Sequence, residues 1–169
     1  MKVMASDWAK YAMEESAREA NRSRGKQNKR LGKSSEDAVL LRLLALGIQQ
    51  VCKIETGWTV IFKMGKPVKA FPIAKVAGDF RGILPGGRSV LVESKAHMGK
   101  DHNLRWSDFD EHQFANLMQH HVFGGLSLVA YTNPYGLEIM RWPIPSFAQG
   151  KSIDPITARV LNLTRLPKG

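Results

Sequence analysis

A single stretch, GDFRGILPGGRSVLVESK at residues 78–95, predicts a β-hairpin that gathers charged side chains. The Pro-Gly-Gly at its centre suits a turn, because glycine adopts the positive φ angles of tight turns and proline cannot continue a ladder. Asp79 opens the first arm, and Glu93, Ser94 and Lys95 end the second. Folding the hairpin about Gly86 places Asp79 opposite Glu93, whereas a slip of one residue places it opposite Ser94.

The alternation of side chains along a strand predicts which of these groups meet. Leu91, Glu93 and Lys95 share one face of the second arm, and Val90 and Val92 share the other. In the first register, two carboxylates and an ammonium converge at a strand end. Such a group can hold a divalent cation beside a proton donor or charge stabiliser. The alternative is that these are ordinary solvated charges of a strand.

The distribution of charge points to a polyanionic partner. The 169-residue chain has a formal net charge of +10, but residues 34–140 carry eleven Lys/Arg against ten Asp/Glu. Residues 1–33 carry nine against four, and residues 141–169 carry five against one. Basic ends around a nearly neutral body predict nucleic-acid binding, the alternative being a basic protein kept soluble by its charge. We divide the chain into a basic, flexible N-terminal arm at 1–31 and a folded domain at 32–169.

Candidate phosphate contacts lie in three segments. The first is the basic arm, the second an expected irregular basic loop at 65–77, and the third a polar loop at 96–105. Their Lys and Arg side chains are Arg18, Arg22, Arg24, Lys26, Lys29, Arg30, Lys33, Lys66, Lys69, Lys75, Lys100 and Arg105. For the arm, the alternative is an inert tail.

An apolar helix is predicted from Ser34 or Ser35, which would cap it, to Gly47, which would end it. Its composition is apolar nearly all round, so we expect it to pack on a sheet. Glu36 in its first turn is either a third carboxylate for the site or only a capping residue.

The remaining segments predict strands and a second helix. Residues 50–64 are expected to form a hairpin around Thr56-Gly57, and residues 126–142 another around a turn at 133–136. A helix is predicted after Ser107, which would cap it with Asp110 at the capping-box position. In it, Gln113 could orient water or a phosphate, or make only ordinary hydrogen bonds. A short helix is expected to start at Asp154-Pro155.

Metal ligands other than carboxylates are few. His97 and His102 are candidates on a loop, although loop histidines usually have no such role. Cys52 is the single cysteine, which excludes an intrachain disulfide and a cysteine-based zinc site. We expect no membrane span and a cytoplasmic protein.

Four motifs follow one another in an order typical of a known group of nucleases. A glycine precedes a helix that opens with an acid, then come an Asp-aromatic-x-Gly strand and a hydrophobic-Glu-x-Lys strand. A helix with His-Gln and a later Gly-Gly completes the series. The motifs are GKSSE at 32–36, Asp79-Phe80-Arg81-Gly82, Val92-Glu93-Ser94-Lys95, and His112-Gln113 with Gly124-Gly125.

Together these motifs resemble the PD-(D/E)xK nuclease superfamily, most closely its RecU-type Holliday-junction resolvases of bacteria and phages, over residues 32–142. The resemblance implies an α/β, restriction-endonuclease-like core with a mixed central sheet flanked by helices. It also implies a homodimer that cleaves DNA, with branched DNA as the expected partner. One departure is that the stalk of RecU-type enzymes has only the short segment 65–77 as a counterpart.

By this resemblance, Asp79, Glu93, Glu36 and the carbonyl of Ser94 would hold Mg²⁺, with Mn²⁺ as a substitute. Lys95 would act on the nucleophilic water or the charge growing on phosphorus, with Gln113 assisting. The resemblance leaves open a nuclease of the same fold that acts on flaps, ends or single strands. A non-catalytic nucleic-acid-binding protein is the remaining alternative.

Overall fold

In a computed structural model, the chain is described for residues 4–55, 57–72, 76–98 and 102–166. It divides into two compact units, Met1–Asp37 and Ala38–Gly169. A single helix, α1 (Met4–Ala45), runs through the first unit and ends in the second. The expected helix start at Ser34 or Ser35 is therefore wrong, and residues 18–33, expected as part of a flexible arm, are helical. Residues 18–33 hold four Arg and three Lys, which favour helix even without an apolar stripe, and these outnumber the two Gly and two Asn that disfavour it.

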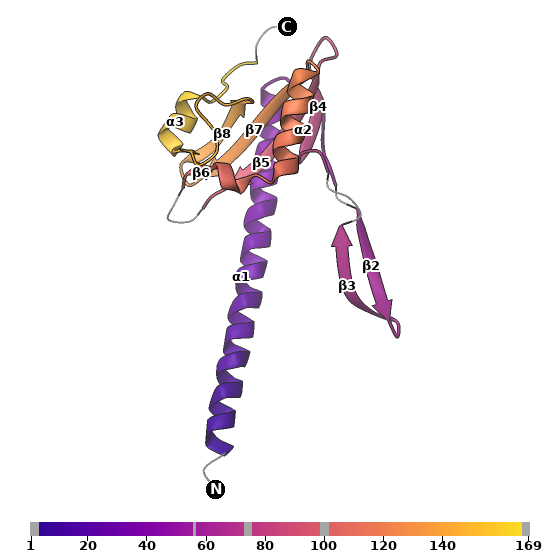
Figure 1. The fold of residues 1–169 in the computed structure, drawn as a ribbon, viewed down its shortest axis with the longest axis vertical. Coiled ribbons are helices and arrows are strands. Elements are labelled where there is room, and N and C mark those ends of the chain that lie inside the picture. The colour runs from indigo at the N-terminus through magenta and orange to yellow at the C-terminus, as the bar shows by residue number, and fades with distance from the viewer. Residues whose placement is uncertain (1–3, 56, 73–75, 99–101, 167–169) are drawn as a thin grey trace. The chain divides into compact units, whose positions relative to one another are not determined.

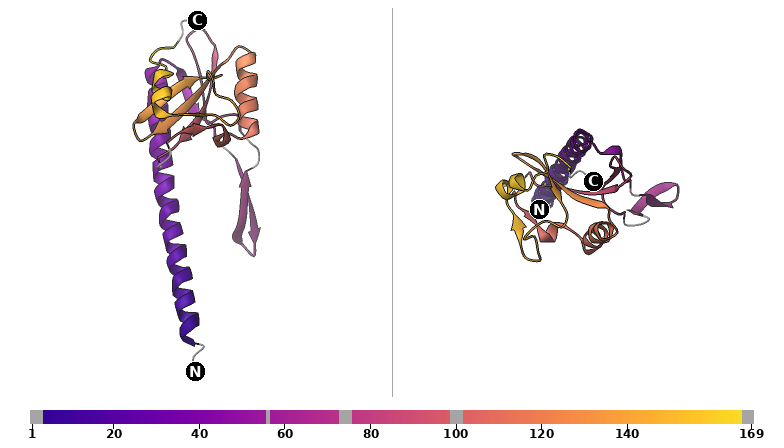
Figure 2. Two further views of the ribbon diagram at one scale, coloured as in Figure 1. Left: turned by 60° about the vertical axis from the view of Figure 1, so that its left-hand side comes forward. Right: turned by 90° about the horizontal axis from the view of Figure 1, so that it is seen from above.

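The second unit is built on a five-stranded mixed sheet with the order β1-β4-β5-β7-β8 (Figure 1). Its strands are β1 (Gln49–Lys53), β4 (Phe80–Ile83), β5 (Ser89–Ala96), β7 (Leu126–Asn133) and β8 (Gly136–Arg141). Only the central pair β5–β7 is parallel, and the other pairs are antiparallel. Helices α2 (Glu111–Val122) and α3 (Pro155–Val160) lie against it, so the predicted α/β class with a mixed central sheet is confirmed (Figure 2).

The alternation of side chains on β5 separates two hydrophobic cores. Val90 and Val92 pack with Val39 and Leu43 from the end of α1. Leu91 belongs to the opposite core, with residues of α2, β7 and the segment that follows β8. The face that carries Leu91 is therefore the face that α2 covers, as the predicted alternation requires.

Two elements depart from the expected strand pairing. β1 does not pair with the next strand but with β4, through Cys52↔Arg81 and Lys53↔Phe80. β2 (Trp58–Lys63) instead pairs with β3 (Lys66–Pro72), so most of the expected loop at 65–77 is a strand. Met64 and Gly65 both have positive φ, which suits the tight turn between β2 and β3. The hairpin is therefore formed by β2 and β3 rather than by the two strands expected within 50–64.

The second helix also begins later than predicted. Residues Trp106–Asp108 form one turn of 3-10 helix, and Phe109 is extended with its ring buried. The extended Phe109 ends that turn, so Asp110 rather than Ser107 caps α2. Two short strands, β6 (Leu104–Arg105) and β9 (Ser152–Ile153), pair with each other. Asp154 caps α3 through the backbone N–H groups of Ile156 and Thr157, as expected.

Candidate active site

The hairpin register brings the predicted acids together. Phe80 pairs with Val92 and Gly82 with Val90, which is the register that folds about Gly86 and puts Asp79 level with Glu93. The backbone N–H of Asp79 donates to the carbonyl of Val92 at 2.8 Å. Gly78 makes this close approach possible, because its φ is +79° and a Cβ there would lie 2.8 Å from the Leu91 side chain.

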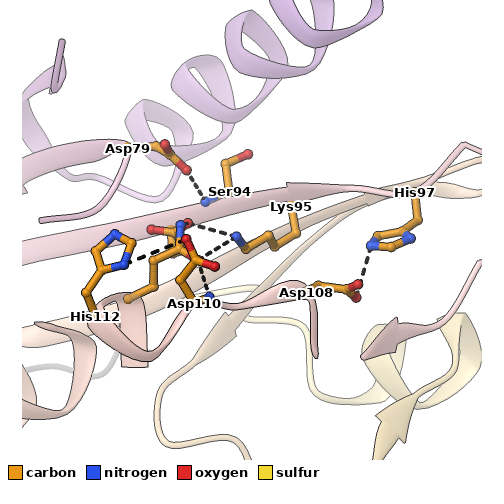
Figure 3. A network of polar contacts seen from close by, with 9 residues as sticks. Asp79, Ser94, Lys95, His97, Asp108, Asp110 and His112 are labelled. Atoms are coloured by element: carbon orange, nitrogen blue, oxygen red, sulfur yellow. Dashed lines mark hydrogen bonds and ion pairs between the residues drawn. The ribbon is translucent and has the colours of Figure 1, made fainter. Parts of the chain in front are cut away.

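Asp79 is tied to the backbone of the second arm. Its Oδ2 accepts a hydrogen bond of 2.7 Å from the N–H of Ser94 (Figure 3). The N–H and C=O of one strand residue face the same neighbour. The carbonyl of Ser94 therefore lies on the Asp79 side of β5, beyond the last paired residue of β4. Asp79 and the Ser94 carbonyl thus offer two oxygen donors at one strand end.

Glu93 is a buried carboxylate with two polar partners. Its side chain is 2 % exposed, and its Oε1 lies 3.0 Å from Nζ of Lys95. The same oxygen accepts a hydrogen bond from the side-chain amide of Gln113. Burial, followed by the nearby charge of Asp79, raises the pKa of Glu93 to about 7, against the opposing effect of Lys95.

Gln113 has one fixed orientation because it belongs to the capping box of α2. Its Oε1 accepts from the backbone N–H of Asp110 and from Nζ of Lys95, both at 2.9 Å. Its amide nitrogen is left to donate to Glu93. The start of α2 therefore positions both charged residues of β5. Sequence reasoning predicted Gln113 but missed that the capping box fixes its orientation, although Asp110 and Gln113 stand at the spacing that signals one.

Lys95 is held on three sides. Besides Glu93 and Gln113, its Nζ lies 4.9 Å from the centroid of the Phe109 ring. The Lys95 side chain is 15 % exposed, so it is largely but not fully shielded from solvent. A cation held this way stands next to the Glu93 carboxylate in a partly desolvated site, where its electrostatic effect is stronger than in water.

A second polar pair extends the same face of β5. His97 Nε2 lies 3.0 Å from Asp108 Oδ2, and Figure 3 shows this pair beyond Lys95 along the strand. The expectation that His97 or His102 binds a metal finds no support. Among residues 4–55, 57–72, 76–98 and 102–166, no three His, Cys, Asp or Glu side chains are grouped for metal binding.

Other predicted residues lie away from this cluster or are not placed with it. Glu36 belongs to the first unit, where it is half-buried on α1, so its role as a third carboxylate stays a prediction. Exposed positions are occupied by Arg18, Arg22, Lys33, Lys66, Lys69 and Arg105. Lys75 and Lys100, and the side chains of Arg24, Lys26, Lys29 and Arg30, lie outside the described residues. None of the described helices is long and apolar enough to cross a bilayer.

Comparison with known proteins adds little to this geometry. No protein-family model matches the chain, and no curated protein matches it. Among solved structures, the chain is similar to Hjc, a Holliday junction resolvase from the archaeal hyperthermophile Archaeoglobus fulgidus. The match has a TM-score of 0.43 and 17 % identity, and it covers 76 % of this chain and 92 % of the other. Any activity for this chain must therefore be argued from its own site.

Proposed function

We propose that this protein is a Mg²⁺-dependent endonuclease that hydrolyses phosphodiester bonds of DNA, with a four-way junction as its substrate. The observation that carries the proposal is the buried contact of Glu93 with Lys95 and Gln113 beside Asp79, at the end of a central strand. The register that brings Asp79 level with Glu93 supports the resemblance of the sequence motifs to the PD-(D/E)xK nucleases. The homodimer and the restriction-endonuclease-like fold are part of the same proposal.

The donor set of the site suits a hard cation. Asp79, Glu93 and the Ser94 carbonyl offer oxygen atoms only, which Mg²⁺ prefers. Two carboxylates suffice, because Mg²⁺ keeps several of its waters and is usually held by one or two carboxylates plus substrate phosphate. Burial and Asp79 raise the pKa of Glu93, and a cation bound beside the two carboxylates would lower it again. Bound Mg²⁺ would lower the pKa of a water and neutralise phosphate charge.

The side chains of this chain would do the remaining work. Lys95 lies beside the Glu93 carboxylate and its side chain stays partly exposed, so it can donate a proton or stabilise charge on a phosphate oxygen. Gln113 keeps the ammonium directed along β5 rather than out into water. The excess of Lys and Arg would bind the DNA backbone, which predicts a steep loss of affinity with salt.

One cleavage experiment separates this proposal from its rivals. Labelled four-way junction, flap, duplex and single-stranded DNA are each incubated with the full chain in Mg²⁺ and in EDTA. We expect Mg²⁺-dependent cutting, fastest on the four-way junction. Cutting of flaps, ends or single strands alone would keep the nuclease but replace the substrate. Binding of DNA without cutting in any metal would overturn the nuclease proposal in favour of a non-catalytic binding protein.

A further inference from the structure

A cavity with no assigned role lies near the end of the sheet where Lys95 is found. It has a volume of about 820 Å³ and is open to solvent. Pockets that hold small ligands measure about 300–1,000 Å³, so it is large enough for one. Its lining comes from the loop after β5, the β7–β8 turn and the start of α3: His102, Asn103, Tyr135, Asp154, Pro155, Ile156 and Arg159.

The walls of this cavity present an aromatic surface. The rings of His102 and Tyr135 meet edge to face with their centroids 5.7 Å apart. Tyr135 is still 65 % exposed and Ile156 is 79 % exposed, so apolar surface faces the open space. An exposed aromatic ring beside aliphatic side chains is a platform on which a planar, apolar ligand can stack.

One cation stands at this platform. The Nε of Arg159 lies 3.6 Å from the buried carboxylate of Glu138, and its Nη2 donates to the Tyr135 carbonyl at 3.4 Å. A guanidinium has five N–H donors, so Arg159, which is 67 % exposed, can still bind an anion. Among the described residues of the lining, Asp154 is the only acid, and it already accepts hydrogen bonds from Ile156 and Thr157 as the cap of α3.

The sheet register places this cation near the candidate active site. Lys95 pairs with Tyr131 on β7, and Tyr131 pairs with Glu138 on β8. Neighbouring strands lie about 4.8 Å apart, so the backbone of Glu138, whose side chain Arg159 contacts, stands roughly 10 Å from that of Lys95 along one row. In stacked DNA that distance corresponds to about three nucleotides.

We propose that this cavity binds one unstacked nucleobase of the DNA strand whose phosphodiester is cut at Lys95. The base stacks on Tyr135 and the adjoining phosphate pairs with Arg159. This inference rests on the proposed function, because it takes its ligand from the DNA held at Lys95. It explains why an aromatic ring and an arginine lie together on the surface at the edge where the strands β5 and β7 end.

The test removes the base and the ring separately and together. DNA junctions with a single abasic site are scanned across the positions around the branch, and their binding is measured in EDTA so that nothing is cut. Wild-type protein should lose about 5- to 100-fold in affinity at one position, as expected for a base stacked on an aromatic side chain. Tyr135→Ala should bind intact DNA that much more weakly and no longer distinguish the abasic site, whereas Tyr135→Phe should behave as wild type.

Two controls make the outcome decisive. Phe123→Ala removes another ring, 80 % exposed but at the end of α2, and should leave the abasic profile unchanged. The double variant Arg159→Gln/Glu138→Gln removes the cation without stranding a buried charge and should lower the salt slope of binding by about one. Equal affinity of Tyr135→Ala and wild type for every DNA would overturn the proposal. Because binding is measured without metal, a failure to cut DNA would refute the nuclease proposal without deciding this one.

Discussion

The two ends of β5 both meet α2 through polar side chains, yet they are built from opposite chemistry. At the start of the strand, Ser89 Oγ lies 2.9 Å from His120 Nε2, and His120 Nδ1 lies 2.9 Å from Ser127 Oγ. Burial, then the charges of Arg88 and His121, lower the pKa of His120 and keep its ring neutral. We call this group, Ser89, His120 and Ser127, the neutral cluster.

At the end of the strand the same helix meets charge instead. Glu93, Lys95 and Gln113, which we call the charged cluster, place a carboxylate and an ammonium in a desolvated position beside Asp79. Hydrogen bonds satisfy the neutral cluster without buried charge, which is how a structural contact is built. The charged cluster carries an acid whose pKa burial has raised, an arrangement that clusters at functional sites. The comparison shows that the C-terminal end of α2 holds the helix to the sheet through the neutral cluster. The N-terminal end instead positions the charged side chains of the candidate active site.

The largest expected effect separates the two clusters by activity. Lys95→Ala should lower the rate of DNA cleavage by about 10²- to 10⁴-fold, the range for loss of a positioned proton donor or charge stabiliser. Its affinity for DNA should stay close to that of wild type, because a single buried cation adds little to a charge of +10. Single-turnover cleavage and filter binding measure the two quantities. Ser89→Ala is the matched control, and a comparable rate loss there would erase the distinction between the clusters.

The pH dependence of stability should have opposite signs at the two ends. The pKa of Glu93 is raised from 4.5 to about 7, so without metal its contribution is full below pH 4.5 and is lost as the pH rises through 7. The cost above pH 7 is about 3 kcal/mol. The lowered pKa of His120 works the other way, and stability is lost as the pH falls below 6.5.

Urea unfolding at a series of pH values measures both slopes. Glu93→Gln should remove the loss between pH 4.5 and 7, and His120→Ala the loss on the acid side. The comparison fails if Glu93→Gln leaves the profile of the metal-free protein unchanged.

A smaller effect on stability tests how closely the side chains of the neutral cluster are packed. Gly125 is buried, and a Cβ added there would overlap the ring of His120. Gly125→Ala should therefore cost about 1–3 kcal/mol of unfolding free energy, as overpacking does. Adding His120→Ala should recover part of that loss, since the ring no longer occupies the space. Gly124→Ala is the neighbouring control: its cost comes from a φ of +87°, with nothing within 4 Å of its Cβ, so adding His120→Ala should not recover it. Thermal unfolding compares the variants.

The smallest effect is expected at Ser89 itself. Ser89 is exposed and contributes one hydrogen bond to His120, so Ser89→Ala should lower stability by about 1 kcal/mol. Cleavage should remain at the wild-type rate. Thermal unfolding resolves such a change. A loss of stability several times larger would mean that the neutral cluster does more than hold α2 against the sheet.

The sequence predicts the charged cluster better than the sheet around it. Turn glycines and strand alternation fix the register of Asp79 against Glu93, because both are local properties of one hairpin. The pairing of β1 with β4 joins residues about 30 apart, and no local pattern distinguishes it from the hairpin expected at 50–64. The start of α2 was misplaced by three residues because Ser107 and Asp110 both suit a cap, and only the burial of Phe109 decides between them.

The measurement that tests the central claim most directly is cleavage of a labelled four-way junction as a function of Mg²⁺ concentration, with the DNA saturated with protein. Wild type and Ser89→Ala should give the same rising curve, and Asp79→Asn should stay near the EDTA baseline at every concentration while it still binds the junction. An Asp79→Asn curve that coincides with wild type would contradict the claim that Asp79 and Glu93 hold the metal that cuts DNA.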